Sequence, residues 1–244
     1  MDRKRIIPFL LLGSLLCSNP VMAGGDDDFG IWTTIEVEKK FDKKWSAAAD
    51  VEYRTYDNVN KTDRVSVGVS ASYKFAKWLK ADAGYSYLHS YQEEEETKKG
   101  NLVLDYWYPR HRVNVSFTGS FEWKRFKFSL RERWQYTYRP QQYAEKYESD
   151  GVTRMDDELI KGKAEHMVRS RLQVEYDIAK CPFTPYASCE FYHNLEGIDK
   201  TRLSVGTEYK INKKHTLELC YRYQDRAHEE IDNHVLGFGY KFKF

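Results

Sequence analysis

The sequence predicts an all-β protein, an antiparallel up-and-down transmembrane β-barrel, and three observations support this prediction. Most of the chain consists of segments of about 10–14 residues in which apolar and polar side chains alternate strictly, so that each strand has two different faces. The connections between these segments are alternately short and long, which is the layout of outer-membrane barrels. A segment with the features of a secretory signal comes before them.

The composition of the 244-residue chain excludes several other classes of protein. Lys and Arg number 39 and Asp and Glu number 37, so the formal net charge is +2. A nucleic-acid-binding protein usually carries a clustered basic excess, which this balance does not provide. Aromatic residues make up 16% of the chain, with 19 Tyr against only 6 Pro, and this is not the composition of a disordered protein.

Residues 1–23 are predicted to be a signal peptide, followed by a single barrel domain over residues 24–244. Three basic residues near the start precede the apolar run Ile6–Leu16, and the segment ends with the small residue Ala23. The apolar run is too short to span a bilayer, which needs roughly 20 residues. Cys17 allows a lipoprotein interpretation, but Leu16 is a poor residue before a lipidated cysteine. Cleavage after Ala23 leaves a mature chain with no formal net charge.

Eleven segments show the alternation expected of a strand. In the segment 64–75, for example, Val65, Val67 and Val69 face one side, and Ser66 and Ser70 face the other. Tilted strands that cross a membrane need about 9–11 residues, and these segments are long enough. The predicted strands are 30–41, 45–56, 64–75, 78–91, 110–123, 126–139, 165–176, 183–194, 201–211, 215–226 and 233–244.

The connections give the barrel two different ends. Tight turns are predicted at 42–44, 76–77, 124–125 and 212–214, and longer polar loops at 57–63, 92–109, 140–165 and 194–200. Large aromatic residues flank three of the tight turns, as in the pairs Phe41 and Trp45, and Trp123 and Phe126. Such rings prefer the headgroup level of a membrane.

The number of strands does not follow directly from this pattern, because eleven is odd and bacterial single-chain barrels have an even number. We therefore expect 12 strands, with 10 as the alternative. The run NLVLDYWY at 101–108 is a candidate for an additional strand. If the number is 10, the N-terminal segment is an arm inside the lumen.

Four stretches of the chain resemble a family of small Gram-negative outer-membrane barrels known only as a domain of unknown function. They are FGIWTTIEVEKKFDKKWSAAADVEYRTYDN, SLRERWQYTYRP, TPYASCEFYHN and GFGYKFKF. The most specific parts surround Arg131 and Arg133, and Tyr186 and Glu190, and the resemblance extends over residues 29–244. It implies an outer-membrane location and a barrel fold, without an established activity. The terminal Phe244 resembles the signal read by the barrel-assembly machinery, which is thereby an expected partner.

If the apolar faces contact outer-membrane lipid, the polar faces line the lumen and bring many ionisable groups together there. Three interpretations are open: an ion-pair network that fills a narrow barrel, a thin water-filled path that favours anions, or a site that binds a small solute or catalyses a reaction. The predicted lumenal charge cluster consists of Arg131, Arg133, Arg169, Arg171, Glu175, Glu190, Arg202, Glu208, Glu218 and Arg222.

One residue breaks the pattern of polar and apolar faces. Glu132 is in phase with Leu130 and Trp134 on the apolar face, where a carboxylate near the middle of a membrane is unfavourable by up to a few kcal/mol. A bulge, a position near the interface or a contact with a partner would each explain it.

We do not expect an enzyme, although a lipid-modifying enzyme of the outer membrane is the rival class. Such an enzyme needs a nucleophile, a base and an orienting group within hydrogen-bond reach. The residue pairs that come nearest to such an arrangement are His89-Ser90 and His193-Asn194. Adjacent residues of a strand point to opposite faces, so His89 and Ser90 cannot assist one another.

A metal ion or cofactor is not expected either. Cys181, Cys189 and Cys220 are not spaced as ligand pairs, and the acidic run 93–96 has the composition of a solvated loop, although it could attract Ca²⁺. A further alternative is a surface-binding protein that acts through its long loops, Gln92–Gly100 and Gln141–Lys163. Nucleic acid is not an expected partner.

Overall fold

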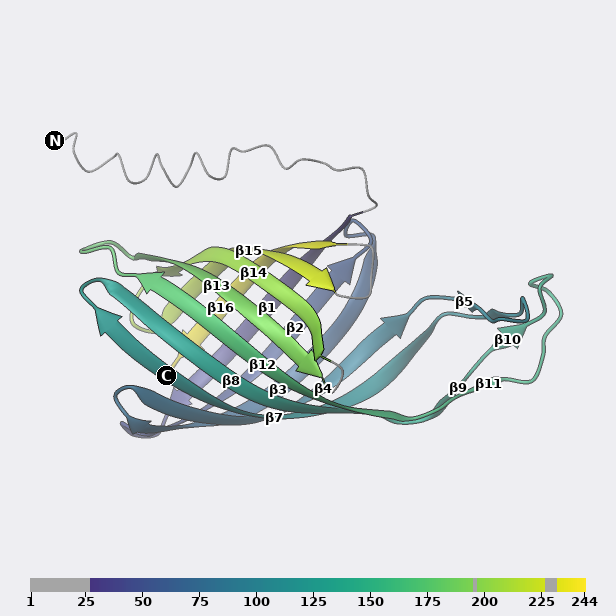
Figure 1. Cartoon of the computed structure of the whole chain (residues 1–244), viewed down its shortest axis with the longest axis horizontal. Coiled ribbons are helices and arrows are strands. Elements are labelled where there is room, and N and C mark those ends of the chain that lie inside the picture. Colours follow the sequence, from purple (N-terminus) through teal and green to yellow (C-terminus); the bar gives the residue numbers. More distant parts are fainter. Residues whose placement is uncertain (1–26, 195–196, 227–231) are drawn as a thin grey trace.

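The computed structural model describes residues 27–194, 197–226 and 232–244, and the predicted signal peptide lies outside these ranges. Eleven strands form a closed barrel (Figure 1), which confirms the predicted fold class. They are β1 (Asp28–Lys40), β2 (Trp45–Tyr56), β3 (Lys61–Ala76), β4 (Leu79–Gln92), β7 (Tyr106–Trp123), β8 (Phe126–Arg139), β12 (Lys163–Tyr176), β13 (Phe183–Asn194), β14 (Gly197–Lys210), β15 (His215–Arg226) and β16 (Asn233–Lys243).

The expectation of 12 strands, with 10 as the alternative, is wrong, because the described chain closes with 11. An up-and-down chain with an odd number of strands brings its first and last strands together in the same direction. Accordingly, β1 pairs with β16 in parallel along an unbroken register from Asp28 and Asn233 to Glu38 and Lys243. This pairing satisfies backbone groups that would otherwise remain at two open edges.

The two segments suspected of changing the strand number do not do so. β1 is part of the barrel wall, paired with β2 on its other side, and is not a lumenal arm. The run 101–108 does not cross the barrel. Leu102–Val103 forms the short strand β6 in a small separate sheet, and Tyr106 begins β7.

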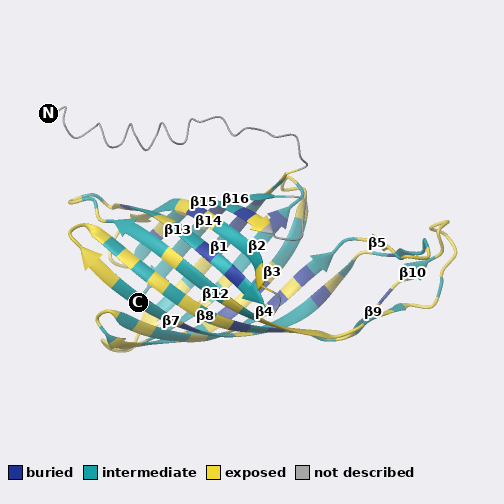
Figure 2. Cartoon of the chain, viewed as in Figure 1, coloured by how far each residue is buried: buried dark blue, intermediate teal, exposed yellow. Residues whose placement is uncertain are grey.

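The alternating apolar and polar side chains lie on opposite faces of the barrel wall. Outward-facing apolar side chains are half exposed, for example Ile35 and Val67 at 50% each, because no described part of the chain covers them. Inward-facing side chains are far less accessible, and Leu88 and Ser90 are each 1% exposed. Figure 2 shows the resulting pattern of exposed and covered residues along the strands. The described ranges contain no helix long and apolar enough to cross a membrane.

The barrel has two unlike ends, which we call the short-turn end and the long-loop end. At the short-turn end the connections are 41–44, 77–78, 124–125, 177–182 and 211–214. Aromatic rings lie on the outer wall beside these turns, and the side chains of Trp45, Trp78 and Trp123 are 50%, 61% and 53% exposed. This girdle matches the pattern that the sequence predicts.

At the long-loop end, residues 93–105 and 140–162 project well beyond the barrel (Figure 1), and we call them the loop arm. The arm contains five short strands in two small sheets, β5–β6–β10 and β9–β11. They are β5 (Glu95–Glu96), β6 (Leu102–Val103), β9 (Gln142–Ala144), β10 (Lys146–Tyr147) and β11 (Glu158–Ile160). At the base of the arm Glu93 accepts hydrogen bonds from Lys61 and Tyr56, and these bonds hold the pKa of the Glu93 carboxyl below its ordinary value.

Candidate lumenal arginine site

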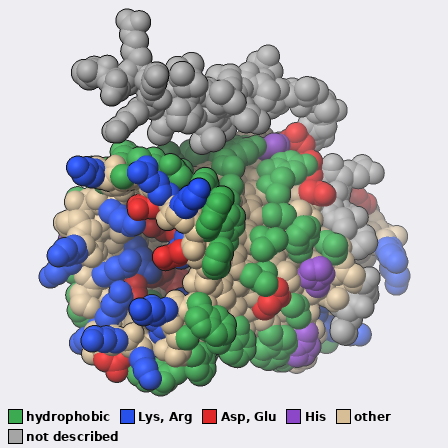
Figure 3. All heavy atoms as spheres, turned by 60° about the vertical axis from the view of Figure 1, so that its left-hand side comes forward, with side chains coloured by type: hydrophobic (Ala, Val, Ile, Leu, Met, Phe, Trp, Pro, Cys, Tyr) green, Lys and Arg blue, Asp and Glu red, His purple; other side chains and the backbone are tan. Residues whose placement is uncertain are grey.

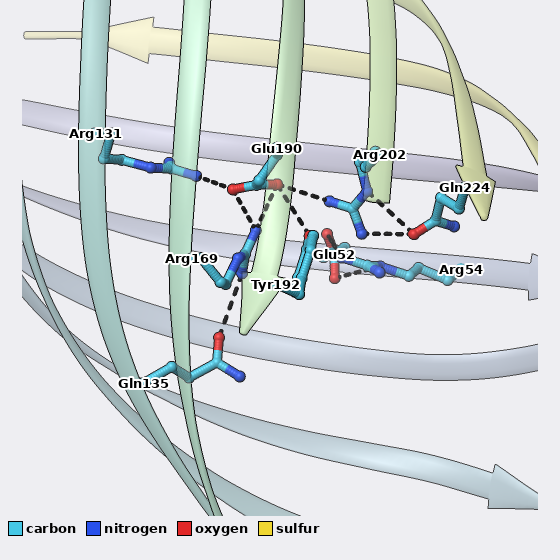
Figure 4. A network of polar contacts seen from close by, with 9 residues as sticks. All are labelled: Glu52, Arg54, Arg131, Gln135, Arg169, Glu190, Tyr192, Arg202 and Gln224. Atoms are coloured by element: carbon cyan, nitrogen blue, oxygen red, sulfur yellow. Dashed lines mark hydrogen bonds and ion pairs between the residues drawn. The ribbon is translucent and has the colours of Figure 1, made fainter. Parts of the chain in front are cut away.

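A buried carboxylate is the centre of the polar network inside the barrel. Glu190 on β13 is 3% exposed and accepts hydrogen bonds from three guanidinium groups (Figure 4). The donor–acceptor distances are 2.6 Å from Arg131, 3.0 Å from Arg169 and 3.4 Å from Arg202. The Tyr192 hydroxyl donates a further bond of 3.0 Å, so one carboxylate accepts hydrogen bonds from three other strands and from its own.

Strand register places the arginines beside this carboxylate in like-charged pairs. Arg131 on β8 lies directly opposite Arg171 on β12, and Arg133 lies opposite Arg169. Like charges directly across a sheet are destabilising unless something compensates them. We call these four residues, Arg131, Arg133, Arg169 and Arg171, the arginine block.

The arginine block has more positive charge than its surroundings neutralise. The side chains of Arg133 and Arg171 form no hydrogen bond or salt bridge with any residue that the structure describes. In all four members the Nε atom is buried and has no hydrogen-bond acceptor in the described chain. A guanidinium group has five N–H donors, so the block presents a surplus of buried donors together with its surplus of charge.

Aromatic rings compensate part of the remaining cationic charge. The Trp32 ring on β1 is 7% exposed, and the guanidinium carbons of Arg54, Arg202 and Arg222 lie 3.5, 4.8 and 5.2 Å from its centroid. The guanidinium carbon of Arg169 lies 4.5 Å from the centroid of the Tyr192 ring. Such contacts are favourable cation–π interactions.

A second carboxylate lies on another part of the wall. Glu52 on β2 accepts a bond of 2.7 Å from Arg54, and Arg64 on β3 lies 3.7 Å away. Four lumenal residues of this region, Trp32, Glu52, Arg54 and Arg64, are not part of the predicted charge cluster. The signal was present, because alternation within 30–41, 45–56 and 64–75 places all four on the polar face.

The ten residues of the predicted charge cluster do not form one site. Arg131, Arg169, Glu190 and Arg202 are joined by hydrogen bonds, Arg133 and Arg171 lie opposite members of that group, and Arg222 contacts Trp32. The other three lie nearer the short-turn end: Glu175 pairs with Lys127 at 2.9 Å, Glu218 accepts a hydrogen bond from Tyr186, and Glu208 is exposed opposite Glu218.

Glu132 lies on the outer face, as the alternation predicts. It is exposed at the middle of β8 and accepts a hydrogen bond of 2.7 Å from the Ser170 hydroxyl on β12. No bulge lies at this point, since the register of β8 with both neighbouring strands is continuous.

The predicted separation of His89 and Ser90 is also present. His89 lies outside the barrel, stacked on Trp107 at 4.9 Å, and Ser90 lies inside, where it accepts a bond of 2.6 Å from Arg110. Over the described ranges, no three His, Cys, Asp or Glu side chains are grouped as they would be to bind a metal ion.

The arginine donors without an acceptor give the lumen groups that are suited to binding anions. Arginine pairs with carboxylate and phosphate through two parallel hydrogen bonds, and such charge-assisted bonds are among the strongest in proteins. A negatively charged group entering beside Arg133 and Arg171 would meet donors that the described protein leaves free.

Solved structures with a similar fold support the description of this barrel. The β domain of the Bordetella autotransporter BrkA aligns with a TM-score of 0.56 and 16% identity, covering 80% of each chain. The translocator domain of the autotransporter NalP from Neisseria meningitidis aligns with a TM-score of 0.55 and 11% identity, over 77% of this chain and 71% of that one. At these identities the likeness concerns the fold alone.

Sequence comparison gives the family. No protein of curated function matches the chain. The model of one family, described as "Protein of unknown function (DUF2490)", matches residues 29–234. This match covers most of the barrel, including the arginine block, and the chain belongs to the DUF2490 family.

Proposed function

We propose that this protein is an outer-membrane barrel, exported with a cleaved signal peptide, whose lumen binds small anionic solutes and lets them pass. The observation that carries the proposal is the arginine block, in which Arg133 and Arg171 have no acceptor among the described residues. The long-loop end then faces the cell exterior and the short-turn end faces the periplasm, as in other outer-membrane barrels.

The charge balance of the lumen supports selection by sign. Ten arginines point inward in the barrel, and fewer carboxylates lie among them, namely Asp50, Glu52, Asp82 and Glu190. In a narrow lumen of low dielectric this excess attracts anions and repels cations much more strongly than it would in water. The ten are Arg54, Arg64, Arg110, Arg112, Arg131, Arg133, Arg169, Arg171, Arg202 and Arg222.

The size of the barrel supports a narrow path. Eleven strands enclose more space than an eight-stranded barrel filled by side chains and less than a 16-stranded porin. Trp32, Tyr192 and Glu190 are each less than a tenth exposed, so side chains crowd this level of the lumen. We therefore infer a constriction at the arginine block that admits small solutes only.

The reversal potential of the refolded protein in a planar bilayer tests the proposal. A salt gradient across the bilayer should give a reversal potential with the sign of anion preference. The double variant Arg133→Gln/Arg171→Gln removes two charges that take no part in the Glu190 bonds, and we expect it to reduce the preference several-fold. Arg154→Gln/Lys161→Gln, which removes two charges from the loop arm, is the matched control and should leave the reversal potential unchanged.

Two results would contradict this function. One is the absence of conductance from protein whose heat-modifiable gel mobility shows that it is folded, which would identify a closed barrel. The other is a cation preference, or an anion preference that the double variant does not alter.

The loop arm favours a second candidate function, which is binding at the cell surface. It carries eleven acidic residues against five basic ones and projects beyond the barrel, so a cationic partner would fit it. Replacing Tyr143–Ile160 by a short Gly-Ser turn should abolish the binding of a fluorescent oligolysine and preserve the reversal potential. Unchanged oligolysine binding would exclude this candidate. Lipid chemistry is not part of the proposal, since His89 and Ser90 lie on opposite faces.

A further inference from the structure

The two ends of the barrel carry opposite charge, although the mature chain as a whole is predicted to be neutral. The five short turns contain eight basic residues and two acidic ones, Asp42 and Asp177. The loop arm at the other end has the reverse balance. Figure 3 brings the short-turn end forward, and Lys and Arg side chains surround it. The eight are Lys43, Lys44, Lys77, Lys124, Arg125, Lys180, Lys213 and Lys214.

Basic residues at the two ends also differ in their partners. At the long-loop end several of them form salt bridges: Lys61 pairs with Glu93, Lys146 with Glu158 at 2.8 Å, and Arg154 with Asp157 at 3.2 Å. The other three basic residues of the loop arm, Lys98, Lys99 and Lys161, form none with a described residue. None of the eight basic residues in the short turns forms a salt bridge with a described residue. The Asp42 carboxylate, which precedes Lys43 and Lys44, accepts hydrogen bonds from the backbone N–H groups of Lys44 and Trp45.

Three lysines at this end lie over outward-facing rings. The Lys39 nitrogen is 5.4 Å from the centroid of Phe244, the Lys44 nitrogen is 5.9 Å from that of Tyr73, and the Lys124 nitrogen is 4.9 Å from that of Trp123. Phe244 and Trp123 are each 53% exposed on the outer wall. Ammonium groups and outward-facing rings therefore lie together at three places on the outside of the barrel. We call this set of residues, Lys39, Lys44, Tyr73, Trp123, Lys124 and Phe244, the short-turn rim.

We propose that the short-turn rim is a binding surface for the phosphate headgroups of anionic phospholipids. Aromatic girdles lie at the headgroup level of a membrane, so lysines folded over the girdle are at the depth of lipid phosphates. Juxtamembrane basic groups attract anionic lipid, and long lysine side chains extend toward the headgroups at an interface. The proposal concerns the outside of the barrel and does not depend on passage through the lumen.

Lipid retention by the refolded mature protein tests the proposal. The protein is equilibrated in detergent with phosphatidylglycerol or with zwitterionic phosphatidylcholine, and retained lipid is counted by native mass spectrometry. We expect phosphatidylglycerol to be retained in preference to phosphatidylcholine. The triple variant Lys39→Gln/Lys44→Gln/Lys124→Gln should weaken this retention by about tenfold or more.

Two matched variants separate charge at the rim from other effects. Lys98→Gln/Lys99→Gln/Lys161→Gln removes the same charge from the loop arm and should retain phosphatidylglycerol as the unmodified protein does. Lys39→Arg/Lys44→Arg/Lys124→Arg keeps the charge at the rim and should also retain it. Heat-modifiable mobility of each variant shows that the barrel is folded.

Three outcomes would overturn the proposal. The first is equal retention of the two lipids by the unmodified protein, and the second is unchanged retention of phosphatidylglycerol by the glutamine variant at the rim. The third is displacement of the lipid by inorganic phosphate at the same concentration, which would mean that the rim recognises free phosphate and not a lipid.

Discussion

At the scale of single residues, Glu190 has more influence than any one of its partners. Its side chain accepts hydrogen bonds from Arg131, Arg169 and Arg202 and from Tyr192, so its loss affects several buried groups at once. Removing one member of a buried ion pair costs more than the pair contributes, because it leaves an uncompensated charge. Removing the charge of Glu190 would leave three buried guanidinium groups without their carboxylate.

We therefore expect Glu190→Gln to lower the free energy of unfolding by about 3 kcal/mol or more. The matched control is Glu175→Gln, also lumenal, whose partners are Gln173 and Lys127, the latter with a side chain that is 43% exposed. Solvent screens that pair, so its loss should cost about 1 kcal/mol or less. Urea denaturation in lipid vesicles, followed by heat-modifiable mobility, measures both. Equal losses in the two variants would contradict a special role for Glu190.

At the scale of the elements, the parallel contact between β1 and β16 is the feature that distinguishes this barrel. Parallel pairing has evenly spaced, slanted hydrogen bonds and is slightly less stable per residue than antiparallel pairing. The register that closes the barrel places Thr33 directly opposite Phe238 on the outer face. A barrel of 12 or 10 strands would not bring these two positions together in this way.

A disulfide bond tests this closure. In a chain whose own cysteines are replaced by serine, Thr33→Cys/Phe238→Cys should form a crosslink on mild oxidation, since paired strand positions lie within the reach of a disulfide. Thr33→Cys/Phe242→Cys, displaced by four residues along β16, should not. Crosslinking is read from mobility on a non-reducing denaturing gel. A crosslink in the second pair, or none in the first, would refute the register.

At the scale of the whole molecule, the barrel follows from the sequence because alternation and strand length are local properties. The presence of all eleven strands was predictable in this way; β2, β8, β13 and β15 have the predicted bounds, and the ends of the others differ by at most four residues. The strand number was wrong because the rule of even numbers describes other barrels and takes no account of parallel closure. The barrel closes through contacts between residues about 200 positions apart in the sequence. A local pattern of side chains cannot predict such contacts.

The candidate site was predictable only in part for the same reason. Alternation placed Arg131, Arg133 and Glu190 inside the barrel, but it cannot show which arginines share a carboxylate. The contact of Trp32 with Arg202 joins β1 to β14, which are not neighbours in the sheet. Such contacts across the lumen depend on the diameter and closure of the whole barrel.

The parallel closure also limits how the chain could be rearranged. Because β1 and β16 run in the same direction, the start of the first strand and the end of the last lie at opposite mouths of the barrel. Joining them would require a linker that spans the full height of the wall, about 11 residues of extended strand at roughly 3.3 Å each, reduced by the tilt. A circular permutant with a short linker, which an even-stranded barrel tolerates, could not be built from this one.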